Sequence, residues 1–249
     1  MGASAFVLSV LALSTLVTSF ISGILGMAGG MILMGVLLAL LALPAAMMLH
    51  GITQLASNGW RALLLRNEVD WRVFGGYAIG ALIALALFAI FRLVVSKPVA
   101  LIAMGLTPFV ALALPDKLHL NVERRGHPVA CGLVCSALAL TAGISGPILD
   151  VFFVRSKMTR HAVVATKATT QSLSHLLKII CFGGVMAVEG AEVSPWLAAT
   201  MVLLAFIGTT LSRQVLERIT DRSFRLWTRW TVMALGAMYL ASGLKLAAA

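Results

Sequence analysis

Long apolar segments follow one another along nearly the whole chain, and this feature constrains the fold more than any other. A helix that crosses a bilayer needs about 20 apolar residues, because lipid cannot satisfy exposed backbone groups. Hydrophobic residues make up 60% of the sequence and charged residues 11%, which excludes a soluble enzyme, a disordered chain and a disulfide-stapled secreted domain. We therefore expect an all-α polytopic membrane protein. Its apolar runs lie at about 4–22, 31–43, 45–65, 73–91, 98–114, 128–142, 147–154, 161–183, 194–212 and 225–244.

Two of these runs, 31–43 and 147–154, are too short to cross a bilayer. Each follows a glycine-bearing break, Gly-Ile-Leu-Gly-Met-Ala-Gly-Gly at 23–30 and Ala-Gly-Ile-Ser-Gly-Pro at 142–147. Glycine tolerates the backbone dihedrals that such a break requires. We interpret 4–43 and 128–154 as helical hairpins that enter the membrane and turn back to the side they came from.

The basic residues orient this arrangement. Of the 19 lysines and arginines, 14 lie in four zones, at 61–72, 117–125, 155–160 and 213–229. If both hairpins turn back, all four zones share one face, which the positive-inside tendency makes cytoplasmic. Both termini are then expected outside the cytoplasmic membrane, and the net charge of +10 belongs to these loops rather than to a nucleic-acid surface. Arg92 and Lys97 fall on the external face, which we attribute to snorkelling at helix ends.

An internal repeat appears when the sequence is shifted by 117 residues (171 − 54 = 117). The shift superimposes the two breaks and, without a gap, lays 50–61 over 167–178. The six polar positions of each segment fall within an arc of about 140° around the helix and so form a polar stripe along one face. Three of the six pairs are identical, and the others match polar with polar. The pairs are His50 with Lys167, Thr53 with Thr170, Gln54 with Gln171, Ser57 with Ser174, Asn58 with His175 and Arg61 with Lys178.

The two hairpins open to opposite sides, so the two copies are predicted to be antiparallel across the membrane. Inverted repeats with interrupted helices and a midplane site recur among secondary transporters. We expect a first repeat at 1–115, a cytoplasmic linker at 116–127 and a second repeat at 128–249. The first contains the hairpin 4–43 and helices 45–65, 73–91 and 98–114; the second contains the hairpin 128–154 and helices 161–183, 194–212 and 225–244.

The repeated glycine-rich break, short half-helix and polar helix resemble the sulfite exporter TauE/SafE family of anion transporters. The resemblance covers most of the chain, in both halves. Ala28 and Ser145 stand where the family usually has glycine. What the resemblance implies is transport of sulfite, a sulfonate or another small sulfur oxyanion.

The start of a half-helix inside the membrane offers unpaired N–H groups and the positive end of a dipole, which together bind anions. Glutamine amides and hydroxyls on the polar faces add donors. Alternatively, the glycines serve tight helix packing and the hydroxyls join helices. The predicted substrate-binding residues are Gly29, Gly30, Ser145, Gly146 and Pro147 at the breaks, with Thr53, Gln54, Ser57, Thr170, Gln171 and Ser174 on the stripes.

Charged and titratable residues within spans are functional candidates. We expect Arg61 and Lys178 to draw anions into vestibules on opposite sides, unless they are ordinary helix-end charges. Asp150 is expected to pair with Lys167 or Arg155, in preference to carrying a coupling proton. The full set of vestibule or coupling candidates is His50, Asn58, Arg61, Asp150, Lys167, His175 and Lys178.

The favoured function is secondary transport of a small anion by alternating access. A passive anion channel is the main alternative, and a membrane assembly factor or an intramembrane enzyme is a minor one. We expect no enzymatic activity, no cofactor and no metal. The expected partners are the anion and the lipid bilayer, and a proton or sodium ion is a candidate for coupling. The sequence leaves open the identity of the anion, the direction of transport and the oligomeric state.

Overall fold

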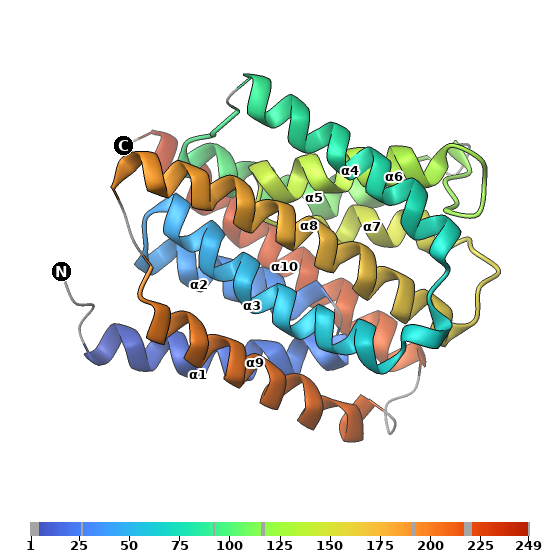
Figure 1. Ribbon diagram of the computed structural model, residues 1–249, viewed down its shortest axis with the longest axis horizontal. Helices are drawn as coiled ribbons and strands as arrows, with labels where there is room; N and C mark the ends of the chain where they lie inside the picture. The colour runs from blue at the N-terminus through green and yellow to red at the C-terminus, as the bar shows by residue number, and fades with distance from the viewer. Residues whose placement is uncertain are drawn as a thin grey trace.

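The computed structural model describes residues 5–25, 27–91, 93–115, 118–190, 193–216 and 221–248. Across these ranges every regular element is helical (Figure 1). The elements are α1 (Ala5–Leu25), α2 (Met27–Leu40), α3 (Leu43–Leu64), η1 (Arg66–Glu68), α4 (Trp71–Phe91), α5 (Lys97–Ala113), α6 (His127–Thr141), α7 (Gly146–Phe153), α8 (Arg160–Glu189), α9 (Pro195–Leu216) and α10 (Asp221–Ala247).

Five of the described helices are long and apolar enough to cross a membrane: α1, α4, α8, α9 and α10. Their outer faces carry exposed large apolar side chains, such as Ile79, Leu82 and Ile90 on α4. Exposing such a surface to water costs free energy, whereas contact with lipid tails does not. The expectation of an all-α polytopic membrane protein is confirmed.

The helices run between two ends of the molecule. In Figure 1 the start of α1 and the end of α10 lie at the left end, together with the residues that join α2 to α3. The connections 65–70, 118–126 and 154–159 lie at the opposite end, where α9 also ends and α10 begins. The described parts of the four basic zones therefore lie at one end, as the hairpin interpretation requires.

Four helix pairs account for most of the packing. α1 lies along α9, α4 along α6, α3 along α8, and α5 along α10. Small residues allow the backbones to approach closely, as is usual inside membranes. A Cβ on Gly80 of α4 would meet the backbone of Val129 and Leu133 in α6, and a Cβ on Gly132 of α6 would meet the backbone of Tyr77 in α4.

The first hairpin differs in detail from the prediction. The sequence predicts a half-helix starting near Gly30, but α2 already begins at Met27, so Gly29 and Gly30 lie in its first turn. Glycine is compatible with a helix, and here its small size decides the packing. A Cβ on Gly29 would collide with the backbone of Thr18 and Ser22 in α1. The second half-helix, α7, begins at Gly146 with Pro147 in its first turn, as predicted.

Two apolar clusters flank the breaks. One surrounds α2 and includes Met31, Met34 and Met47. The other surrounds α7 and includes Ile148 and Leu149. Both half-helices are thereby held inside the protein, where irregular backbone is tolerated. The division into two inverted repeats stays a prediction.

Candidate functional site

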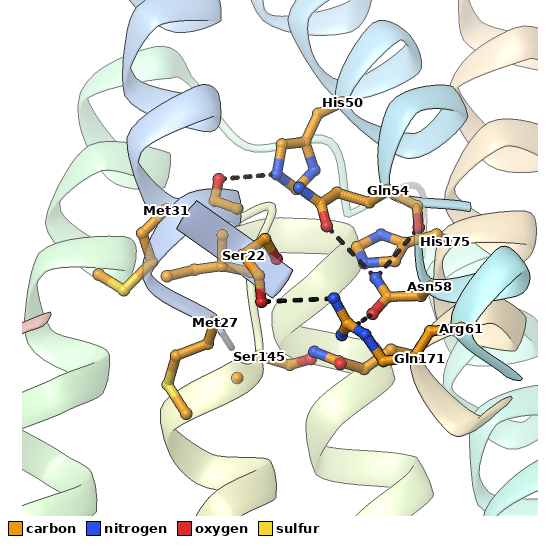
Figure 2. Close-up of a pocket in the computed structure, with 13 residues that line it drawn as sticks. Ser22, Met27, Met31, His50, Gln54, Asn58, Arg61, Ser145, Gln171 and His175 are labelled. Atoms are coloured by element: carbon orange, nitrogen blue, oxygen red, sulfur yellow. Dashed lines mark hydrogen bonds between the residues drawn. The ribbon is translucent and has the colours of Figure 1, made fainter. Parts of the chain in front are cut away.

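The two breaks meet at one cavity, although 117 residues separate them in the sequence. Its volume is about 30 Å³. A single water needs at least about 10–15 Å³, so this space suits a few waters or one small ion. Figure 2 shows side chains converging on it from α2, α3, α8 and the second break. The lining residues are Ser22, Met27, Gly30, Met31, His50, Gln54, Asn58, Arg61, Ile144, Ser145, Gly146, Gln171 and His175.

One wall of the cavity is the N-terminus of α7. Ser145 occupies the cap position, and its hydroxyl makes no capping hydrogen bond to the helix. Gly143 has φ of 80°, in the left-handed region, which lets the chain turn sharply from α6 into this half-helix. The first N–H groups of a helix have no partner within it, and the dipole places partial positive charge there. This wall is therefore electropositive.

Two buried side-chain nitrogen atoms on the cavity wall lack hydrogen-bond partners among the described residues. They are Nε2 of Gln54, a residue that is 3% exposed, and Nδ1 of His175, a residue that is 7% exposed. The amide oxygen of Gln54, Oε1, accepts a hydrogen bond of 3.3 Å from Nδ2 of Asn58 (Figure 2). An unsatisfied buried polar group costs about 1–3 kcal/mol. A ligand or water in the cavity would remove this cost.

Glycine at position 30 makes room for the Gln54 amide. A Cβ on Gly30 would lie 3.1 Å from Nε2 of Gln54 and 3.3 Å from its amide carbon. These distances are tighter than ordinary van der Waals contact. Any larger residue would push the amide from its position on the cavity wall. The structure therefore links one residue of the first break to one residue of the polar stripe.

A chain of hydrogen bonds connects the two breaks behind this wall. His50 donates from Nε2 to the Gly30 carbonyl, at 2.9 Å (Figure 2). Lys178 donates from Nζ to Nδ1 of His50, at 2.7 Å, and to the Gly143 carbonyl, at 3.0 Å. Lys178 is fully buried and does not line the cavity itself. One lysine thus joins the first turn of α2, through His50, to the turn before α7.

Arg61 occupies the matching place in the first half of the chain. Its guanidinium donates to the Ser22 carbonyl, at 3.3 Å, and to Oδ1 of Asn58, at 3.4 Å (Figure 2). Ser22 lies in the last turn of α1, and Gly143 is the second residue after the end of α6. Arg61 and Lys178, related by the 117-residue shift, therefore both donate to carbonyls at the C-terminal end of a broken helix. Cations are favourable at that end of the dipole.

Several predicted contact residues lie off the cavity wall. Thr53 donates to the Leu49 carbonyl at 2.8 Å, and Thr170 donates to the Lys167 carbonyl at 2.9 Å. Gly29 packs against α1, and Pro147 is buried in α7. Their predicted contact with substrate stays a prediction. The predicted residues that do reach the cavity are Gly30, Ser145, Gly146, Gln54 and Gln171, with His50, Asn58, Arg61 and His175 from the vestibule or coupling set.

The matched serines join helices. Ser57 shares a hydrogen bond of 2.7 Å with Thr209 of α9. Ser174 shares one of 2.7 Å with Tyr77 of α4 and one of 2.9 Å with Ser136 of α6. These bonds fit the alternative in which hydroxyls hold helices together. Substrate contact at either serine would require these bonds to break.

Asp150 pairs with Lys167, one of its two expected partners. The pair joins α7 to α8, and both side chains are partly exposed, at 38% and 25%. Neither residue lines the cavity.

Some cavity residues could not be recognised from the sequence. Met27, Met31 and Ile144 are apolar residues among many others, and their position depends on how the breaks fold.

A family model described as Sulfite exporter TauE/SafE matches residues 11–239. The chain belongs to this family. TauE/SafE proteins are membrane transporters that export sulfite and related sulfur anions, and they are not enzymes. The resemblance drawn from the glycine-rich breaks is confirmed, and this TauE/SafE protein is a multi-pass membrane protein. No curated protein and no solved structure matches the chain.

Proposed function

We propose that this TauE/SafE protein is a secondary transporter that binds a small sulfur oxyanion in the cavity between its two breaks. It exposes this site alternately to the two sides of the cytoplasmic membrane. The observation that carries the proposal is the convergence of the α7 N-terminus and the unpartnered Gln54 amide on one small cavity. Both features offer donors, which an oxyanion accepts.

The charges around the cavity support an anion as the ligand. The residues that line it include Arg61 and two histidines but no aspartate or glutamate among the described positions. Donors inside a protein interact with an anion more strongly than donors in water, because the effective dielectric constant is lower. We assign Gln171 and Ser145 as further donors to the bound anion, since both line the same space.

Alternating access follows from the proposed inverted repeat. The pairing of α1 with α9 corresponds to the pairing of α6 with α4 when the first five helices are matched in order with the second five. The same matching exchanges α3 with α8 and α5 with α10, so each of these two packed pairs is matched with itself. This pattern supports two equivalent halves that rock against each other around a fixed site.

Flux in proteoliposomes tests the proposal. Purified protein is expected to carry labelled sulfite or thiosulfate with saturation, and unlabelled anion on the opposite side is expected to accelerate labelled flux. Such acceleration requires a site that faces the two sides in turn. Flux that never saturates and shows no acceleration would indicate a passive channel, and flux equal to that of empty liposomes would refute transport of these anions.

The orientation has its own test. We propose that the loops rich in lysine and arginine face the cytoplasm and that both termini lie outside. In a variant without native cysteines, Ser194→Cys before α9 is expected to react with an impermeant thiol reagent added to intact cells. Lys157→Cys, between α7 and α8, is expected to react only after permeabilisation. The reverse labelling pattern would contradict this orientation.

A further inference from the structure

We propose that Lys178 and His50 form a proton-binding pair that couples anion transport to a proton. In this scheme the protein takes up about one proton with each anion that enters the cavity, and both ions cross together. The proposal rests on the proposed function, since it needs a bound anion. It adds the identity of the coupling ion and of the residues that carry it.

Lys178 is fully buried and has no carboxylate partner among the described residues. The nearest described ion pair along its own helix uses Lys167, which lies 11 residues earlier in α8, or about 16 Å along the axis. A buried ammonium group without a counter-charge is costly. Its charged form is therefore stabilised most when a negative charge enters nearby. The cavity behind His50 provides the place for that charge.

The hydrogen bonds around Lys178 match an amine that gains and loses a proton. Its two described acceptors are Nδ1 of His50 and the Gly143 carbonyl. Two acceptors match in number the two N–H hydrogens of a neutral amine. An ammonium group carries a third hydrogen, for which no acceptor is present among the described residues. We therefore assign the neutral amine to the protein without a bound anion and the ammonium form to the protein with an anion in the neighbouring cavity.

His50 connects this amine to the cavity. Because Nε2 of His50 donates to the Gly30 carbonyl, Nδ1 is the unprotonated nitrogen and accepts from Lys178. If the ammonium transfers a proton, one N–H bond breaks at Nζ and one forms at Nδ1, so the total charge of the pair is unchanged. The resulting imidazolium lies on the cavity wall. The positive charge of the pair can thus reach the anion through the ring.

Few other titratable groups surround the pair. His175 of α8 lies with its ring centre 5.5 Å from that of His50, and it also lines the cavity. Cys181, one turn further along α8, packs against the apolar cluster. Arg61 lies about three turns further along α3. The first turn of α2 and the turn before α7 offer carbonyls, from Gly30 and Gly143.

None of these described groups is a carboxylate, so the anion itself supplies the counter-charge. Binding of the anion then raises the affinity of the pair for a proton. By thermodynamic linkage, the proton must raise the affinity for the anion by the same factor. Net movement of anion and proton together follows from this reciprocity, provided that the pair is exposed to each side in turn.

The position of Gly143 explains how the proton reaches the other side. A Cβ on Gly143 would meet Met34 of α2 and Met47 of α3, which are both buried. The turn that joins α2 to α3 lies at the end of the molecule that holds the termini (Figure 1). In the proposed scheme, this buried packing and the Lys178 contact with Gly143 separate the cavity from that end. Opening toward that end must separate these groups and admit water to the amine. Proton exchange and access to the anion site thus change in one step.

Proton uptake by the wild-type protein gives the first test. Thiosulfate or methanesulfonate, which both stay ionised near neutral pH, is added to purified protein in weakly buffered detergent solution, and the pH change is recorded. About one proton taken up per anion bound is expected. Anion binding without proton uptake would overturn the proposal and leave the transport function intact. Absence of binding or exchange would instead refute the proposed function, so the two failures are distinguishable.

Variants locate the proton. Lys178→Gln and His50→Gln keep a polar group of similar reach. Both are expected to bind the anion more weakly than wild type and without proton uptake, because the proton that favours the anion is lost. Lys245→Gln, in the exposed last turn of α10, is the matched control and is expected to behave as wild type. Proton uptake that persists in both Lys178→Gln and His50→Gln would reject this pair as the carrier.

Transport measurements distinguish a loss of proton coupling from a loss of folded protein. An acid exterior is expected to drive accumulation of thiosulfate in wild-type proteoliposomes, and Lys178→Gln should reduce this accumulation by about 10-fold or more. Exchange of thiosulfate for thiosulfate needs no net proton movement, so the variant is expected to retain it. A wild-type protein that exchanges thiosulfate but ignores the pH gradient would contradict proton coupling, whatever the stability of the variants.

Discussion

Replacing Gln54 with glutamate is expected to weaken anion binding by more than about 100-fold. The two side chains have nearly the same shape, so the variant changes charge rather than volume. It removes the Nε2 donor that lies unpartnered on the cavity wall. It also places a negative oxygen where the anion must bind, in a site that is 3% exposed and poorly screened. The dissociation constants of wild type and variant, measured by calorimetry at the same pH, check this result.

A neutral replacement separates the two effects. Gln54→Ala removes the donor without adding repulsion, and we expect a loss on the order of 10-fold, which corresponds to one hydrogen bond to a charged group. Thr107→Val in α5 is the control. Its hydroxyl donates to the Ala103 carbonyl of the same helix, and it lies away from the cavity. Affinity that is equal in wild type and Gln54→Glu would show that the anion binds elsewhere.

Replacing Gly132 with valine is expected to lower the melting temperature by about 10 °C, because overpacking costs up to about 3 kcal/mol and a chain of this size loses roughly 2–4 °C per kcal/mol. A Cβ at this position meets the backbone of Tyr77 in α4, which cannot move aside as a flexible side chain can. α4 and α6 would have to separate. Thermal unfolding of the purified protein in detergent measures the effect.

The matched control lies on the partner helix. A Cβ on Gly75 of α4 would have no neighbouring atom within 4 Å, so Gly75→Val is expected to leave the melting temperature unchanged. Equal melting temperatures for Gly132→Val and wild type would contradict the close α4–α6 contact. A similar loss in both variants would show that valine itself, rather than the contact, lowers stability.

Sequence periodicity predicted the features that depend on local chemistry. The glycine-rich breaks, the two short half-helices and the polar stripes follow from which residues lipid tolerates. The stripe on 50–61 placed His50, Gln54, Asn58 and Arg61 on one face, and all four line the cavity. Charge counting placed the basic loops at one end of the molecule. Each of these inferences depends on the residues of a single helix or loop and on no distant partner.

Features that depend on distant partners were beyond the sequence. The start of α2 at Met27 depends on how closely Gly29 approaches α1, which no local pattern encodes. Ser57 and Ser174 looked equivalent to Gln54 on the stripe, yet their hydroxyls meet Thr209 and Tyr77 on other helices. A helical wheel defines a face about 140° wide, whereas the cavity occupies only part of that face.

The small volume of the cavity also determines which ionic form can enter. A space of about 30 Å³ leaves room for few water molecules beside a bound oxyanion, so we expect the anion to lose much of its hydration shell on binding. Every water molecule left behind must be replaced by a fixed donor, and the wall offers few of them. Stripping a dianion costs far more than stripping a monoanion, since solvation energy rises steeply with charge. Discrimination should therefore follow the cost of dehydration, with hydrogen sulfite favoured over sulfate of similar size.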